Sequence, residues 1–111
     1  MRELDLKYPG CPIRNVLSRF SDKWSLLILI NLNGKEKMRY KELAKAIPDI
    51  SQKMLSSTLK QLERDHFLTR KAFAEIPPRV EYSLTETGKS LMPILEVMID
   101  WSSAHFSEVT S

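Results

Sequence analysis

One side of a single predicted helix gathers cations and hydroxyl groups in the segment Gln52–His66. At about 100° per residue, the leucines of this segment and His66 fall together on one side of the helix. The opposite side carries the residues Lys53, Ser56, Ser57, Lys60 and Arg64. Solvated helix faces usually mix charges of both signs, because oppositely charged neighbours stabilise the helix. A stripe of cations and hydroxyls opposite a leucine stripe instead predicts contact with DNA phosphates and base edges.

The order of these residues along the helix predicts different roles for them. The first turn of a helix that enters the major groove meets the base edges. Gln52 can pair with adenine and Lys53 with guanine, whereas serine hydroxyls accept several bases. Lys60 and Arg64 lie farther along the helix and are better placed for phosphates.

A stiff loop at residues 75–79 is the second candidate element for DNA contact. Its two prolines cannot lie inside a strand ladder, and they reduce the entropy that the loop loses on docking. Arg79, with Arg70 and Lys71 at the base of the loop, is expected to reach phosphates or an adjacent minor groove. The DNA-binding set predicted from the sequence is Arg39, Ser51, Gln52, Lys53, Ser56, Ser57, Lys60, Arg64, Lys71 and Arg79.

The elements that position these residues follow from the apolar spacing. Helices are expected at residues 12–20, 23–32, 41–47 and 52–66, strands at 68–74 and 80–84, and a last helix from Thr85 to Phe106. Ser51 is the expected N-cap of helix 52–66. In the second strand, alternation places Val80, Tyr82 and Leu84 inside and Glu81 and Ser83 outside.

A helix-turn-helix followed at once by a hairpin is the winged-helix order. The predicted fold class is therefore mainly α with a small β-hairpin, a winged helix-turn-helix with extra dimerisation helices at both ends. We expect an N-terminal arm at residues 1–10, one domain at residues 11–106 and a C-terminal tail at residues 107–111.

The last helix has more apolar surface than one small domain can cover. Its apolar residues span an arc of roughly 220°, whereas a stripe of about 100° is enough to cover one core. We therefore expect a homodimer, with an interface formed by Ile13, Leu17, Leu91, Leu95, Met98 and Trp101. Gly88 and Pro93 both lie in this helix against ordinary helix preferences.

Composition narrows the function classes. The chain has 111 residues and a net charge of +3, but residues 35–79 alone carry +5, and residues 80–111 carry −4. This asymmetry is typical of a nucleic-acid face on one part of a molecule. With one cysteine and two histidines, the chain forms neither an intramolecular disulfide nor a Cys/His metal cluster, so no metal is expected. His66 and His105 are interpreted as structural residues.

The remaining patterns predict neither an enzyme nor a membrane protein. The sequence has no glycine loop for phosphates and no nucleophile elbow, so neither catalysis nor a cofactor is expected. The longest apolar run, Leu26–Ile30, is far shorter than a membrane span, and acidic residues replace the apolar core of a signal peptide. A cytoplasmic, nucleoid-associated location is expected. A winged-helix module that binds protein instead of DNA remains the alternative.

Several motifs between about Cys11 and Trp101 occur together in one known family. They include Cys11-Pro12, Asp22-Lys23-Trp24, Arg39-Tyr40-Lys41-Glu42-Leu43 and, most specifically, the segment from Pro77 to Gly88. With these motifs the chain resembles the HxlR family of bacterial winged helix-turn-helix transcriptional regulators. Ser21-Asp22 stand where the family typically has glycine. The resemblance implies a homodimer on an operator with two half-sites, and it identifies no effector.

The resemblance also implies a role for Cys11, because some members sense electrophiles or oxidants with the cysteine at this place. Its position at a helix start, one turn from Arg14, is compatible with a reactive thiol. Since the chain has no second cysteine, oxidation would require the partner's Cys11 or a small thiol. The alternative is an unreactive cysteine kept for packing.

Overall fold

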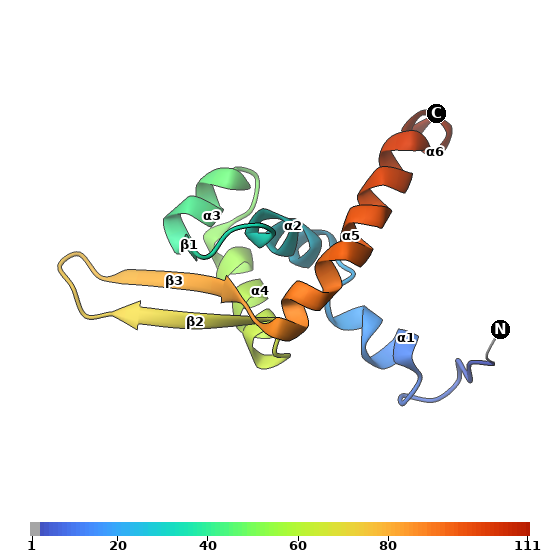
Figure 1. The fold of residues 1–111 in the computed structure, drawn as a ribbon, viewed down its shortest axis with the longest axis horizontal. Coiled ribbons are helices and arrows are strands. Elements are labelled where there is room, and N and C mark those ends of the chain that lie inside the picture. Colours follow the sequence, from blue (N-terminus) through green and yellow to red (C-terminus); the bar gives the residue numbers. More distant parts are fainter. Residues whose placement is uncertain (1–2) are drawn as a thin grey trace.

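A three-stranded antiparallel sheet and a set of helices make up the computed structural model, which describes residues 3–111 (Figure 1). The helices are α1 (Pro12–Asn15), the 3-10 helix η1 (Leu17–Arg19), α2 (Lys23–Leu32), α3 (Tyr40–Ala46), α4 (Gln52–Arg64), α5 (Glu86–Ala104) and α6 (Phe106–Thr110). The strands are β1 (Met38–Arg39), β2 (Leu68–Phe73) and β3 (Arg79–Leu84), in the sheet order β1-β3-β2. Helices α3 and α4 followed by the hairpin β2–β3 confirm the predicted winged helix-turn-helix.

Helix α2 lies at the centre of the core, because it is apolar on nearly every side. Its side chains Ile28, Leu29 and Leu32 are completely buried, and α5 packs Met92 and Leu95 into the same cluster. Leu95, expected at a dimer interface, is only 1% exposed within its own chain and packs into this core. The periodicity of α5 shows the width of its apolar arc but not which part of the arc faces the core.

Helix α4 ends earlier than predicted, at Arg64, because His66 adopts the left-handed conformation with φ 67°. The backbone then closes a Schellman motif: Phe67 N donates to Leu62 O at 2.9 Å and His66 N to Glu63 O at 3.0 Å. His66 therefore leaves the helix and is exposed, whereas the spacing placed it on the leucine side.

Replacing His66 by glycine is expected to raise the free energy of unfolding by up to about 1 kcal/mol, because a left-handed backbone is unfavourable for a residue with a Cβ. Urea unfolding followed by circular dichroism measures the change. A loss of stability would mean that the imidazole makes a contact worth more than the strain.

Both ends of the chain differ from the prediction in detail. The first helix is split at Val16 into α1 and η1. Helix α5 continues through Pro93 to Ala104, and after His105 the chain forms α6, which includes most of the expected C-terminal tail. Within residues 3–111, no helix combines the length and the hydropathy that crossing a membrane requires.

Candidate nucleic-acid interface

Helix α4 presents the predicted cationic face to solvent. Ser51 is its N-cap, with the hydroxyl oxygen accepting from Met54 N at 3.0 Å. The leucines at positions 55, 59 and 62 are buried, which fixes the rotation of the helix against the core. The predicted residues that lie exposed on α4 or at its N-cap are Ser51, Gln52, Lys53, Ser57, Lys60 and Arg64.

Ser56 is held between the two helices of the helix-turn-helix. Its hydroxyl lies 3.1 Å from the Tyr40 hydroxyl of α3, which also donates to Gln52 O at 3.3 Å. The Ser57 hydroxyl donates to Met54 O within its own helix. The structure thus gives Ser56 a partner that links α3 to α4, whereas the sequence placed it among the groups that face DNA.

The register of the wing separates its two basic residues. Arg70 pairs across the ladder with Tyr82, and Lys71 pairs with Glu81. Successive side chains of a strand point to opposite faces, so these two cations lie on opposite faces of the hairpin. Arg70 lies on the α4 side, beside Lys60 and Glu63, whereas the prediction placed it only at the base of the wing.

A cavity of about 540 Å³ lies between α4 and the wing. Lys60 and Arg70 contribute cations to it, and Tyr40, Ser56 and Tyr82 contribute hydroxyl groups, with Glu63 as the acid. Burial raises the pKa of Tyr82, and the neighbouring Arg70 guanidinium acts in the opposite direction. The phenol therefore remains a hydrogen-bond donor at neutral pH, and the cavity wall suits a phosphate oxygen. The sequence signal for the position of Arg70 was the inward-facing Tyr82, because Arg70 is its partner across the β2–β3 ladder.

Glu81 contradicts the predicted alternation, because only 6% of its surface is exposed. Its carboxylate lies 3.3 Å from Arg79 Nε and 3.5 Å from Lys37 Nζ. The register also places Arg39 on β1 and Lys71 on β2 directly beside it. Strand β1 makes β3 the central strand, and the surrounding cations compensate the buried charge.

Arg79 lies at the start of β3 and is engaged by neighbours. Its guanidinium lies 3.1 Å from Glu75 Oε2 and 4.1 Å from the centre of the Phe73 ring, in addition to the contact with Glu81. The sequence predicts that this arginine reaches phosphates or an adjacent minor groove. In the structure its charge is shared with two carboxylates, while Arg39 and Lys71 lie exposed nearby.

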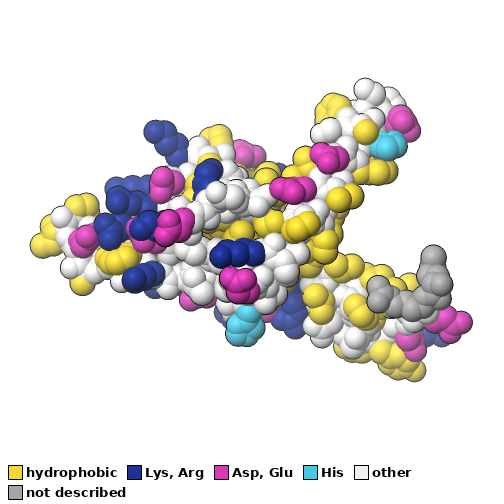
Figure 2. Space-filling model, viewed as in Figure 1, with side chains coloured by type: hydrophobic (Ala, Val, Ile, Leu, Met, Phe, Trp, Pro, Cys, Tyr) yellow, Lys and Arg dark blue, Asp and Glu magenta, His cyan; other side chains and the backbone are white. Residues whose placement is uncertain are grey.

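Charge is unevenly distributed over the surface. Figure 2 shows the dark blue cations gathered over the wing and the adjoining helix α3, with magenta acids among them, while the charged groups seen along α5 are magenta acids. The yellow apolar side chains collect on α5 and around α1. The cationic part of the molecule is therefore separated from its apolar part.

The predicted interface residues other than Leu95 lie on this apolar part. Ile13, Leu17, Met98 and Trp101 are each at least 43% exposed, and Leu91 packs partly against the core. A groove of about 280 Å³ between α2 and α5 continues the surface, lined by Leu26, Ile30, Leu95, Met98, Ile99, Ser102, Ser103 and Phe106.

Cys11 is the N-cap residue of α1, and its side chain is buried. The neighbouring Arg14 guanidinium donates to the carbonyl oxygens of Leu6 and Lys7, which fastens the N-terminal arm to α1. His105 stacks on Trp101 with ring centres 4.5 Å apart. Across residues 3–111, no group of three or more His, Cys, Asp or Glu side chains is placed to hold a metal ion.

Comparison with known proteins identifies the family. The HxlR-like helix-turn-helix model matches residues 19–110. An HTH-type transcriptional regulator from Methanothermobacter thermautotrophicus is 39% identical over 97 residues, which cover 87% of this chain and 73% of the relative. The solved structure of YtfH, a transcriptional regulator from Salmonella typhimurium, has a TM-score of 0.83 at 34% identity and covers 96% of this chain and 95% of its own.

A further solved structure is that of the redox regulator HypR in its oxidised form. It has a TM-score of 0.77 at 35% identity and covers 85% of this chain and 96% of its own. The match of the family model to most of the chain, together with relatives that are themselves transcriptional regulators, confirms the resemblance seen in the motifs. The chain belongs to the HxlR-like helix-turn-helix family of transcriptional regulators.

Proposed function

We propose that this protein is a homodimeric, sequence-specific DNA-binding transcriptional regulator. Helix α4 enters the major groove, and the wing lies on the adjacent backbone or minor groove. The observation that carries the proposal is the exposed face of α4, where Lys53, Lys60 and Arg64 lie opposite a fully buried leucine face. Arg70 and the cavity hydroxyls extend this face toward the wing and offer a seat for a phosphate.

The dimer follows from the apolar surface on α1 and α5. A second copy covers this surface, and the two α4 helices then read two half-sites about 34 Å apart, one turn of DNA. Family membership supports this arrangement, because regulators with a helix-turn-helix commonly bind as dimers to operators with two-fold symmetry.

The experiment that tests the proposal is a gel shift with the intergenic DNA that flanks the gene of this protein. Unrelated DNA of equal length is the control, at one physiological salt concentration, because affinity depends on salt. Retention of the flanking DNA at protein concentrations that leave the control free is expected. Equal binding to both would contradict sequence specificity and favour the protein-binding module.

Substituting alanine for Lys60 is expected to weaken binding to operator and unrelated DNA by a similar factor. It should also reduce the slope of log affinity against log salt by about 1, because one phosphate contact is lost. Fluorescence anisotropy over a salt series measures both quantities. Lys89→Ala is the matched control, since Lys89 lies on α5 beside Glu86. A loss that depended on a single base pair would instead assign Lys60 to base contact.

We also propose that oxidation of Cys11 controls DNA binding, as the likeness to the redox regulator HypR supports. Diamide takes two electrons and two protons from two thiols, and the disulfide forms between Cys11 and the partner's Cys11 or a small thiol. Cys11 is only 5% exposed, so its oxidation requires a local rearrangement that uncovers the thiol.

Diamide is accordingly expected to change the operator affinity at least tenfold, and dithiothreitol should restore it. The Cys11→Ser variant should bind as the untreated protein does and ignore diamide. The same gel shift measures the effect, with non-reducing electrophoresis to show any linked dimer. An equal response of wild type and variant would exclude Cys11 as the sensor.

A further inference from the structure

The turn that joins α4 to β2, residues 65–67, receives contacts from the N-terminal helices. Arg19 Nη1 of η1 lies 2.5 Å from Asp65 Oδ1. Directly beside this ion pair, Phe20 packs edge-on against Phe67 with ring centres 5.5 Å apart. The segment that carries Ile13 and Leu17 is therefore fastened to the end of the candidate recognition helix.

Helix α5 contacts the same turn from its own N-terminus. The Thr85 hydroxyl donates to His66 O at 2.6 Å, and Thr85 N donates to Phe67 O at 3.1 Å. The oxygen of the same hydroxyl accepts from Gly88 N at 3.0 Å. Both elements that carry the exposed apolar surface thus meet at the point where α4 ends.

Asp65 occupies a position that is unfavourable for a negatively charged carboxylate. It is the C-cap residue of α4, and the negative end of the helix dipole disfavours an acid there. Its side chain is only 4% exposed, so the charge is also desolvated. Helix formation alone does not account for an aspartate at this site, whereas the arginine from the N-terminal segment compensates both effects.

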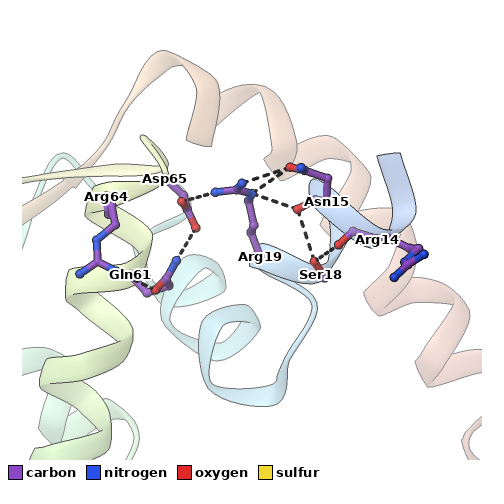
Figure 3. Close-up of polar contacts among 7 residues, drawn as sticks. All are labelled: Arg14, Asn15, Ser18, Arg19, Gln61, Arg64 and Asp65. Atoms are coloured by element: carbon purple, nitrogen blue, oxygen red, sulfur yellow. Dashed lines mark hydrogen bonds and ion pairs between the residues drawn. The ribbon is translucent and has the colours of Figure 1, made fainter. Parts of the chain in front are cut away.

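Each partner of the ion pair is also held by nearby residues of its own segment (Figure 3). Asp65 Oδ2 accepts from Gln61 Nε2 at 2.8 Å, and Gln61 Oε1 accepts from Arg64 Nη1 at 3.3 Å. On the other side, Arg19 Nε donates to Asn15 O at 2.9 Å, and Nη2 donates to Asn15 Oδ1 at 3.1 Å. A continuous set of polar contacts therefore connects α1 with Arg64 on the DNA-facing side of α4.

We infer that Asp65 is a positioning residue, and that its ion pair with Arg19 fixes the orientation of α4 relative to the dimerisation surface. In a dimer, this orientation sets the separation of the two α4 helices and hence the spacing of half-sites that the protein accepts. The inference rests on the proposed function. A rigid connection matters because a helix rotated by a few degrees at its C-terminal end moves its N-terminal turn away from the bases.

The test compares wild type with Asp65→Asn, Arg19→Gln and Arg19→Lys on operators whose half-sites are moved apart or together by one or two base pairs. Wild type should prefer one spacing at least tenfold. The two variants that remove a charge should lose most of this preference, and Arg19→Lys, which keeps the charge, should retain it. Lys89→Gln breaks the exposed Lys89–Glu86 pair and is the control, with no change expected. Equal weakening at every spacing would show a role in stability only and overturn the inference.

A second measurement separates this inference from the proposed function. Spin labels at Ser57→Cys in a Cys11→Ser background report the distance between the two α4 helices without DNA. Asp65→Asn should broaden the distance distribution, with sedimentation still showing a dimer. An unchanged distribution would overturn the inference. If wild type binds no DNA specifically, the proposed function fails, whereas a broadened distribution would still assign the positioning role to Asp65.

Discussion

The Gly88→Ala variant is expected to lose about 2–3 kcal/mol of unfolding free energy, because an alanine there collides with backbone. A Cβ at this position of α5 would lie 2.2 Å from Phe67 O and 3.1 Å from Leu84 Cδ2. Phe67 O cannot move away freely, since it accepts the hydrogen bond from Thr85 N. Helix propensity alone predicts the opposite sign, a gain of up to about 1 kcal/mol.

Urea unfolding of Gly88→Ala and Gly10→Ala tests this expectation. Gly10 is the matched control, because a Cβ built there meets nothing within 4 Å. Its substitution should be neutral or stabilise by at most about 1 kcal/mol, through the smaller entropy of the unfolded chain. If the two variants were equally stable, the approach of α5 to the α4–β2 turn would be looser than the structure shows.

The helices were predictable because their apolar spacing is local. Ser51 before the leucines of α4 predicted the second helix of the helix-turn-helix, and the all-round apolar character of α2 predicted its central place in the core. The end of α4 was harder to predict from the sequence. His66 adopts a left-handed conformation that glycine prefers, and no glycine marks this position. The need for glycine at position 88 could not be predicted from the sequence either, because the backbone that excludes a Cβ belongs to Phe67 in the α4–β2 turn.

The strands show the limit of alternation as a guide. The pattern of β3 assumed a hairpin with one solvated face, and it placed Glu81 there. The short strand β1 adds to the free edge of β3, and Lys37, Arg39, Lys71 and Arg79 surround the carboxylate. A buried acid of this kind depends on pairing between segments more than 40 residues apart in the chain, which periodicity does not contain.

The candidate site was predicted better on the helix than on the wing. Lys53 and Lys60 lie exposed, because one helix face determined their direction. On the wing, the register of the β2–β3 ladder determines which face of the hairpin each cation lies on. In the observed register, Arg70 lies on the α4 side and Lys71 lies on the opposite side. These placements describe the geometry, while the DNA contacts themselves remain a prediction.

The Trp101→Asp variant is expected to convert the proposed dimer to monomers at micromolar concentration. Trp101 is 57% exposed on α5, next to the exposed side chains of Val97 and Met98. In the proposed dimer, an aspartate here would place an unpaired charge in an apolar interface. We expect the dimer dissociation constant to rise at least about 100-fold, equivalent to about 2.7 kcal/mol. Sedimentation velocity over a concentration series measures the change.

Ser90→Asp adds the same charge near the other end of α5, where the residue is exposed and polar, and it should leave the dimer intact. Circular dichroism separates dissociation from unfolding, because a folded monomer keeps its helical signal. Operator affinity should fall together with the dimer, since the two α4 helices then no longer bind as one unit. Unchanged sedimentation of Trp101→Asp would show that Trp101 lies outside the dimer interface. The apolar end of α5 would then be expected to bind a different partner.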